Sequence, residues 1–380
     1  MRSSEATLIN RIPLLLLSLD YPPNDGGISR LGAGLVTTMV GRGLSPRIVS
    51  LVDAGKSGIH RPAATHVDVE PARSRRDLQI FCNVRAHLAK YGRDAPILAT
   101  VWNPEATLAL LAGARRVSIL AHGNEVMPYL RSGLKGRLRR YVLKRAHVVI
   151  CNSRFTESLV LDAAPAARTM VVNPGVDATL ATRTRAEARS IHNIDATANV
   201  ILTVARLDAI KGHETVLRAL AALPAERRQS FVYVIVGKGD MREALERQAN
   251  QLGIADLVRF EGFVADSELP EWYAAADAFV LTSVVDPQRR GMEGFGMAFT
   301  EAQAAGLAVI GTRSGGIPDA VSEGEGGWLI DERDAEALAG HLRRLNDDPA
   351  SFRMQGAKGA ARVRREMNWT TYTDRILAAI

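Results

Sequence analysis

The densest group of residues that could do chemistry lies in the segment 292–302, MEGFGMAFTEA. Glu293 precedes Gly294 and Gly296, and Glu301 follows inside an expected helix. The glycines leave the first backbone N–H groups of that helix uncovered, so an anion such as a phosphate can approach its positive end. About 12 Å of helix rise separates the two carboxylates, so they would hold two parts of one elongated ligand. The alternative interpretation is a helix-start carboxylate and an exposed surface residue.

A second group of charged residues follows an apolar stretch in the same half of the chain. Arg206 and Lys211 stand five positions apart in the segment 205–212, ARLDAIKG. Two cations in a loop beyond the carboxyl end of a strand can clamp a diphosphate, with arginine as a fork and lysine as a mobile point charge. Taken alone, the segment is better explained as an exposed loop with solvated cations. Its coexistence with the glutamate–glycine helix start favours the diphosphate.

Two loops in the first half of the chain could face a ligand. Gly26 and Gly27 follow the first expected strand, and consecutive glycines permit close backbone approach, although a plain tight turn explains them as well. The spacing G-x-G-x-x-G is absent, so they are no dinucleotide fingerprint. His122 ends another expected strand and precedes Gly123. A lone histidine is often structural, so both a structural role and a site role remain open here.

The elements that must position these residues repeat as apolar strand, glycine-bearing turn and helix, which is typical of parallel sheets with crossover helices. Strands are expected near 12–19, 46–51, 96–101, 117–121, 147–151, 169–173, 200–205, 231–237, 258–261, 278–282 and 308–311. The length of 380 residues fits two such α/β domains, and the polar segment 178–198 separates them. Ligands of doubly wound sheets bind beyond the carboxyl ends of the strands, where all four loops fall.

Composition narrows the class of protein. The two cysteines, Cys82 and Cys151, are far apart and lack metal-ligand spacing, which indicates a reduced, cytoplasmic setting. No apolar stretch approaches the roughly 20 residues of a membrane span. The short run at 12–17 is expected to be a buried strand and not a signal peptide. The formal charge is +7, and the excess of lysine and arginine lies within residues 1–180, which indicates a partner that meets the first half.

In this order, the motifs resemble a retaining glycosyltransferase of family four with the GT-B fold, of mannosyltransferase type. The resemblance spans the chain, and its most specific part is Glu293 to Glu301 continuing to Gly315 and Gly316. The weaker matching pieces are Gly26-Gly27, His122-Gly123, Asn152-Ser153-Arg154, Asn173 to Asp177, Arg206 to Gly212, and Val236 to Gly239.

The resemblance implies two Rossmann-like doubly wound α/β domains that face each other across a deep cleft. Residues 1–180 would form an N-terminal acceptor-binding domain and residues 181–365 a C-terminal domain that binds the nucleotide sugar. Residues 366–380 would form a C-terminal helix that crosses back to the first domain.

The resemblance also assigns roles to side chains. Arg206 and Lys211 would hold the donor diphosphate, Glu301 the ribose and Glu293 the transferred sugar, while His122 would reach the reacting region. The implied catalytic residues are Glu293, His122, Arg206 and Lys211. The implied donor-binding residues are Gly26, Gly27, Arg206, Lys211, Gly237, Val264, Glu293, Gly294, Phe295, Gly296, Met297 and Glu301.

The implied reaction needs neither metal nor cofactor. Negative charge builds on the leaving diphosphate while the sugar becomes cationic, and preplaced cations and helix N–H groups stabilise the diphosphate. No Asp-x-Asp metal signature lies in a suitable loop. The approach Arg289-Arg290 to Gly294 favours GDP-mannose as donor, with UDP-sugars close behind. A saccharide or lipid-linked saccharide is the expected acceptor, in cell-envelope polysaccharide or lipopolysaccharide synthesis.

A basic helix is expected near 131–145, where seven cations occur without an acid. They are Arg131, Lys135, Arg137, Arg139, Arg140, Lys144 and Arg145, with Leu134, Leu138, Tyr141 and Val142 at helical spacing among them. This pattern favours peripheral attachment to the anionic inner face of the cell membrane. Nucleic acid is not expected, since aromatic residues for base stacking are missing. The alternative is a solvated helix that keeps the protein soluble.

Rival functions remain open at this point. One is another enzyme of the same architecture, such as a nucleotide-sugar epimerase. Another is a non-catalytic nucleotide-sugar sensor or partner subunit. The joint presence of Glu293, Glu301, Arg206, Lys211 and His122 argues against the sensor.

Overall fold

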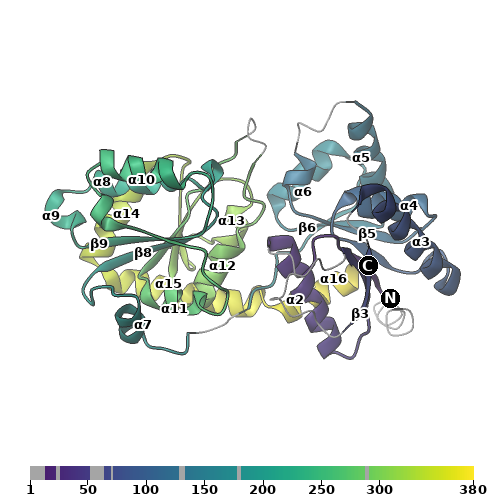
Figure 1. The fold of residues 1–380 in the computed structure, drawn as a ribbon, viewed down its shortest axis with the longest axis horizontal. Coiled ribbons are helices and arrows are strands. Elements are labelled where there is room, and N and C mark those ends of the chain that lie inside the picture. Colours follow the sequence, from purple (N-terminus) through teal and green to yellow (C-terminus); the bar gives the residue numbers. More distant parts are fainter. Residues whose placement is uncertain are drawn as a thin grey trace. The chain divides into compact units, whose positions relative to one another are not determined.

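The computed structural model describes residues 13–22, 26–51, 64–69, 72–127, 133–177, 181–286 and 291–380. The chain divides into two compact units (Figure 1). Unit 1 comprises Met1–Gly175 together with Trp369–Ile380, and unit 2 comprises Val176–Asn368.

Unit 1 is a parallel sheet with helices on both faces (Figure 1). Its seven strands have the order β3-β2-β1-β4-β5-β6-β7, so the order reverses direction between β1 and β4. The strands are β1 (Leu15–Leu17), β2 (Arg47–Leu51), β3 (Thr65–Val69), β4 (Ile97–Ala99), β5 (Val117–Ala121), β6 (Val148–Cys151) and β7 (Thr169–Val171). The helices are α2 (Gly27–Gly41), α3 (Arg73–Tyr91), α4 (Thr107–Leu111), α5 (Gly133–Arg145), α6 (Arg154–Ala163) and α16 (Trp369–Ala379). The central strands are apolar and buried, as expected for a sheet covered on both faces.

Unit 2 repeats this architecture with six parallel strands in the order β10-β9-β8-β11-β12-β13. The strands are β8 (Asn199–Val204), β9 (Phe231–Val236), β10 (Val258–Gly262), β11 (Ala278–Val280), β12 (Ala308–Thr312) and β13 (Gly327–Ile330). The helices are α7 (Arg185–Ile191), α8 (His213–Ala221), α9 (Ala225–Arg228), α10 (Arg242–Gln251), α11 (Leu269–Ala275), α12 (Met297–Ala304), α13 (Ile317–Ala320), α14 (Ala335–Asp347) and α15 (Pro349–Glu366). In both units the strand order reverses near the middle of the sheet, and ligands of such sheets bind beyond the carboxyl ends of the strands at that point.

The last helix, α16, belongs to unit 1 although it follows unit 2 in the sequence. It packs against α2, where Arg42 forms an ion pair with Asp374 and donates to the carbonyl of Thr370 at 3.0 Å. Any side chain larger than glycine at Gly34 or Gly175 would overlap the indole of Trp369. Tyr372, Ile376 and Ile380 are buried in the same apolar cluster as β1 and α2, so α16 completes the core of unit 1. The expected boundaries were 180/181 and 365/366, whereas the units divide at 175/176 and 368/369.

Two strands were not expected from the sequence, β3 and β13. Each lies at one edge of its sheet and pairs with a single neighbour. β3 contains three polar residues and only Val69 in it is buried, and β13 has only four residues. Both therefore lack the long apolar run that marked the central strands.

Candidate active site

The loop after β8 in unit 2 carries Arg206 and Lys211. Within it, Asp208 accepts a hydrogen bond from the backbone N–H of Ile210 at 3.1 Å and thereby starts the helical turn Ala209–Lys211. Gly212 then adopts a left-handed backbone with φ 71°, and a Cβ atom there would overlap the carbonyl oxygen of Thr282. Only glycine fits, because it alone combines this conformation with so close an approach.

His213 stabilises the same loop through a hydrogen bond to its backbone. It is buried at the start of α8, and its Nε2 donates to the carbonyl of Arg206 at 3.2 Å. Burial lowers the pKa of His213 to about 4, so the ring is neutral near pH 7. Arg206 itself points outward: its side chain is 77% exposed and pairs with Asp208 at 3.1 Å.

Lys211 is held by Glu293. The Nζ of Lys211 lies 2.5 Å from the Oε2 of Glu293, and the two side chains are only 15% and 16% exposed. The backbone carbonyl of Glu293 accepts from the N–H of Gly316 at 2.8 Å, and a Cβ at Gly315 would overlap this carbonyl. The glycine loop after β12 therefore fixes the position of Glu293.

The helix start after Glu293 is α12. Gly296 caps it with φ 92°, and glycine offers no side chain to occupy the first backbone N–H groups. Phe295 is buried beneath this turn, while Gly294 and Met297 are half-buried. Further along the helix, the Oε2 of Glu301 accepts from the hydroxyl of Tyr273 on α11 at 3.2 Å. Sequence reasoning missed Tyr273, which carries no motif of its own.

Gly237 and Val264 follow β9 and β10. A Cβ at Gly237 would overlap the carbonyl of Ala205, and the N–H of Gly237 donates to Gly262 at 2.7 Å. The loops after β8, β9 and β10 therefore interlock through backbone atoms. Val264 is half-buried, and the neighbouring Phe263 is exposed, with the Nζ of Lys238 lying 5.6 Å from its ring centre. An aromatic face and a cation thus stand at this edge of the sheet.

In unit 1, His122 follows β5. Its Nε2 lies 2.8 Å from the carbonyl of Thr100, and because a carbonyl only accepts, Nε2 carries the proton. The backbone N–H of His122 donates to Glu125 at 2.6 Å. In the neutral ring Nδ1 is therefore the nitrogen left to accept a hydrogen bond from a ligand.

Asp20 joins this group and was not predicted. A Cβ at Gly26, the residue before α2, would lie 3.7 Å from the Oδ2 of Asp20. Burial raises the pKa of Asp20, and the nearby His122 opposes that rise. Gly26 and Gly27 begin α2 without a side chain over its first N–H groups. The predicted residues of unit 1 thus gather at the carboxyl ends of β1 and β5, as those of unit 2 gather beyond β8, β9, β11 and β12.

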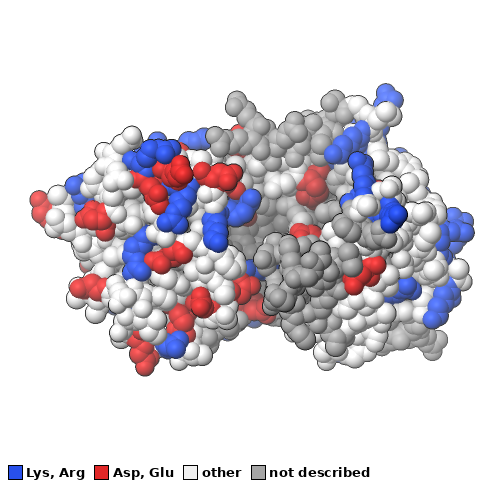
Figure 2. Space-filling view, in the orientation of Figure 1, with Lys and Arg blue, Asp and Glu red and all other residues white. Residues whose placement is uncertain are grey.

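The basic helix α5 presents a mixed surface. Leu134, Leu138 and Tyr141 are exposed at spacings of four and three residues, and Lys135, Arg137, Lys144 and Arg145 are exposed among them. Lysine and arginine side chains gather over the end of unit 1 that carries α5, whereas both signs of charge mix on unit 2 (Figure 2). Arg131 lies outside the described residues, as do Arg289 and Arg290.

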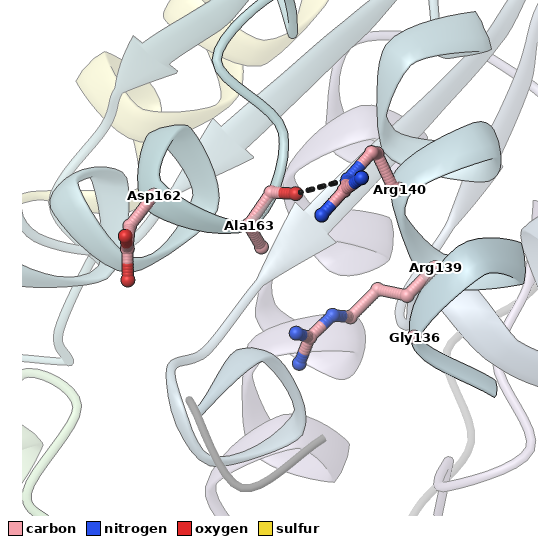
Figure 3. Close-up of a pocket in the computed structure, with 5 residues that line it drawn as sticks. All are labelled: Gly136, Arg139, Arg140, Asp162 and Ala163. Carbon is pink, nitrogen blue, oxygen red and sulfur yellow. Dashed lines mark hydrogen bonds between the residues drawn. The ribbon is translucent and has the colours of Figure 1, made fainter. Parts of the chain in front are cut away.

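The expectation that Arg139 faces a membrane was wrong. Its side chain is buried and donates to the carbonyl of Met127 at 3.0 Å. A cavity of about 160 Å³ separates α5 from the end of α6, lined by Gly136, Arg139, Arg140, Asp162 and Ala163 (Figure 3). Arg140 donates to the carbonyl of Ala163 at 3.3 Å across it. Both arginines thus bind backbone carbonyl groups, and the carbonyl that accepts from Arg140 lies at the negative end of α6.

Within the described ranges, no group of three or more His, Cys, Asp or Glu side chains could hold a metal ion. No helix in that same part of the chain is long and apolar enough to cross a membrane.

Comparison with known proteins decides the family. The model described as Glycosyltransferase Family 4 matches residues 25–180, and the model described as Glycosyl transferases group 1 matches residues 184–362. A GDP-mannose-dependent alpha-(1-6)-phosphatidylinositol monomannoside mannosyltransferase of Mycobacterium tuberculosis is 30% identical over 383 residues, covering 96% of each chain. The chain is a family 4 glycosyltransferase. The predicted family is thereby confirmed.

Other relatives and solved structures agree with this glycosyltransferase assignment. A D-inositol 3-phosphate glycosyltransferase of Thermomonospora curvata is 37% identical over 225 residues, which are 55% of this chain and 50% of the relative. Sucrose-phosphate synthase of Thermosynechococcus elongatus superposes with a TM-score of 0.79 at 24% identity, over 96% of this chain and 97% of the other. Anabaena HepE in complex with UDP and glucose gives 0.78 at 22% identity, over 96% and 98%. The predicted GT-B fold with two Rossmann-like domains is confirmed.

Proposed function

We propose that this glycosyltransferase transfers a hexose from a nucleotide-diphosphate sugar to a saccharide or lipid-linked saccharide acceptor, with retention and without a metal ion. The proposal is carried by one observation: Lys211, paired with Glu293, and the uncapped start of α12 stand at the carboxyl edge of one sheet. A diphosphate bound there would meet fixed positive groups at the moment its leaving charge develops.

The ion pair gives Lys211 and Glu293 distinct tasks. An ammonium group has three N–H donors, and the contact with Glu293 uses one of them. The other two are available for phosphate oxygens, so Lys211 would bridge the diphosphate and the carboxylate. Glu293 would then accept from hydroxyls of the transferred sugar and stabilise its developing positive charge. Arg206, which is exposed and pairs with Asp208, would bind the outer phosphate oxygens.

The remaining predicted residues suit the nucleoside. Glu301, with Tyr273 beside it, would accept from the ribose hydroxyls. The base would lie beyond Gly237 against Val264, with the exposed ring of Phe263 as a stacking face. In unit 1, His122 and the Gly26–Gly27 turn would serve the sugar and the acceptor, with Nδ1 of His122 as a hydrogen-bond acceptor.

GDP-mannose is the favoured donor and a UDP-sugar the second choice. The relatives aligned over nearly the whole chain are named as GDP-mannose-dependent enzymes, whereas the HepE structures hold UDP or UDP-glucose. The same relatives are named for phosphatidylinositol monomannoside, which supports a lipid-linked acceptor. The proposal also includes a place in the synthesis of cell-envelope polysaccharide or lipopolysaccharide, as expected from the sequence.

A donor panel tests this function directly. The purified chain is incubated with GDP-mannose, UDP-glucose and UDP-galactose, with and without EDTA, and nucleotide release and product are measured. Turnover with GDP-mannose that EDTA leaves unchanged, and an α-linked product by NMR, are expected. Activity that EDTA abolishes and manganese restores would refute the metal-independent mechanism, and an absence of turnover with every donor would favour a nucleotide-sugar sensor.

Attachment to an anionic membrane through α5 is part of the proposal. The exposed stripe of Leu134, Leu138 and Tyr141 among cations is the arrangement of a helix that rests in a lipid headgroup layer. We expect flotation with phosphatidylglycerol-containing vesicles to be lost when Lys135, Arg137, Lys144 and Arg145 are replaced by serine. The control replaces Arg343 and Arg344 of α14 in unit 2 by serine and should leave flotation unchanged. Flotation unaffected by the α5 replacements would refute the attachment.

A further inference from the structure

Glu105 is a buried carboxyl group that none of the site motifs includes. It lies on the helical turn Trp102–Ala106 after β4, and it is only 1% exposed. Its Oε1 accepts from the backbone N–H of Leu19 at 2.8 Å, and its Oε2 accepts from the backbone N–H of Val101 at 2.9 Å. The hydroxyl of Thr100 completes the set, 3.0 Å from Oε2 and 3.3 Å from Oε1.

These donors come from two loops that border the proposed site in unit 1. Leu19 follows β1 and directly precedes Asp20, whereas Thr100 and Val101 follow β4. β1 and β4 are neighbours at the point where the strand order reverses, which is where ligands bind in such sheets. One carboxylate thus ties together the two loops that flank this point.

The network continues to His122. The carbonyl of Thr100 accepts from Nε2 of His122 at 2.8 Å, so a single residue lies between the Glu105 carboxylate and the imidazole. From the other side, the indole of Trp102 donates to the carbonyl of Glu125, whose carboxylate holds the backbone N–H of His122. Displacement of the turn that carries Glu105 would therefore change both the tautomer and the direction of the His122 ring.

We infer that Glu105 is a positioning residue for glycosyl transfer, which fixes His122 and the segment at Leu19 and Asp20 in the geometry that the reaction needs. This inference rests on the proposed function, because it gives Glu105 a task only if His122 faces the reacting sugar.

A buried carboxyl group is unfavourable for stability, so its presence at Glu105 supports a role beyond packing. Burial raises the pKa of Glu105 to about 7, although its hydrogen bonds act in the opposite direction. A folded-state pKa above the unfolded value means that the native state loses stability as the pH rises towards 7. Both oxygens accept backbone N–H groups, so an amide would set its own NH₂ against one of these donors. The residue is therefore costly for stability and poorly replaced by glutamine.

The test compares Glu105→Gln with Thr100→Val, which removes only the hydroxyl donor, and with Asp94→Asn, a control at an exposed acid of the same unit. We expect kcat to fall about 30-fold in Glu105→Gln and about threefold in Thr100→Val, since a misplacement of 1 Å at a reacting group costs up to about 100-fold. The dissociation constant of GDP, measured by calorimetry, should stay within about twofold, because the proposed nucleotide-binding residues belong to unit 2. Asp94→Asn should match the wild type.

A spectroscopic measurement distinguishes a positioning role of Glu105 from a purely structural role. Nitrogen-15 NMR of histidine-labelled protein, with the His122 signals assigned through His122→Asn, should show an Nε2-protonated ring in the wild type and a mixture of tautomers in Glu105→Gln. A wild-type kcat in Glu105→Gln, or His122 signals unchanged in it, would overturn the inference. So would a loss of GDP binding parallel to the loss of turnover, which would mark a structural role. If Glu105→Gln does not fold, Thr100→Val carries the same two criteria.

If the proposed function is wrong, these experiments give a different result. In that case the wild type shows no turnover with any donor, and the NMR comparison still decides whether Glu105 sets the His122 ring.

Discussion

The half-sites of the two units are built in different ways. In unit 2, the proposed donor residues stand on loops locked by glycines, where backbone atoms of Gly212, Gly237 and Gly315 approach neighbouring carbonyls too closely for any side chain. In unit 1, a buried carboxyl group, Glu105, gathers backbone N–H groups and orients His122 through Thr100. Backbone contact tolerates no substitution, whereas a side-chain network can be altered stepwise. The contrast predicts that substitutions in the glycine-locked loops of unit 2 are tolerated less well than substitutions around His122 in unit 1.

Replacement of a glycine in the glycine-locked loops of unit 2 should have the largest effect on the free energy of unfolding. Gly212→Ala forces a Cβ against the carbonyl of Thr282 in a left-handed backbone, so we expect unfolding to become easier by at least about 3 kcal/mol. Gly43→Ala is the control, since Gly43 also has a positive φ of 77° but no atom within 4 Å of its Cβ position. It should cost only about 1 kcal/mol. Urea unfolding measures both, and equal costs would remove the distinction between close approach and conformation.

His213 should make the folding stability of unit 2 sensitive to acid. Its pKa is about 4 when folded, against an ordinary value of 6.5, so protons bind the unfolded chain first. The stability contributed by neutral His213 is therefore complete above pH 6.5 and is lost as the pH falls towards 4. Between pH 7 and pH 5 we expect a loss of about 2 kcal/mol through this residue.

The variant His213→Gln measures how much of the acid sensitivity comes from His213. Glutamine can still donate to the carbonyl of Arg206 but does not titrate, so the acid sensitivity should shrink relative to the wild type. His87 in α3 of unit 1, whose pKa is also lowered to about 4 by burial, provides the matched replacement. Its variant should relieve acid sensitivity without any effect on GDP affinity. An unchanged pH dependence in His213→Gln would contradict the assignment.

The smallest effect concerns the ion pair itself. Glu293→Gln keeps an acceptor for Lys211 but removes a negative charge near the proposed diphosphate, so GDP should bind about tenfold more tightly while turnover falls. Glu246→Gln, at an exposed acid of α10, serves as the control. Calorimetry with GDP and a turnover assay give the two readings. Weaker GDP binding in Glu293→Gln would mean that the carboxylate aids the nucleotide and does not compete with it.

The central strands and the unit 2 loops could be predicted from the sequence because their signals are local. An apolar run, a glycine and a charged residue stand within a few positions of each other at Glu293 and at Lys211. The roles of these residues stay predictions. Glu105, Asp20 and Tyr273 could not be found in this way, because each interacts with a residue that is far away in the sequence: Leu19, His122 and Glu301, respectively.

The incorrect prediction that Arg139 faces a membrane is explained by the spacing of the buried residues in α5. Gly136, Arg139 and Leu143 fall on one face of α5 at spacings of three and four residues, and all are buried. That pattern marks the inner face, and the charge of Arg139 concealed it. The edge strands β3 and β13 were missed for different reasons. β3 is partly exposed, which weakens its apolar signal, and β13 is buried but has only four residues.

The membership of α16 in unit 1 has a consequence for how the protein is made. Because Tyr372, Ile376 and Ile380 complete the core around β1 and α2, unit 1 cannot finish folding until residues 369–380 have been translated. Residues 176–368 are translated before that point and contain all the strands of unit 2, so unit 2 can fold earlier. We therefore expect unit 2 to fold before unit 1, although most of unit 1 is translated first.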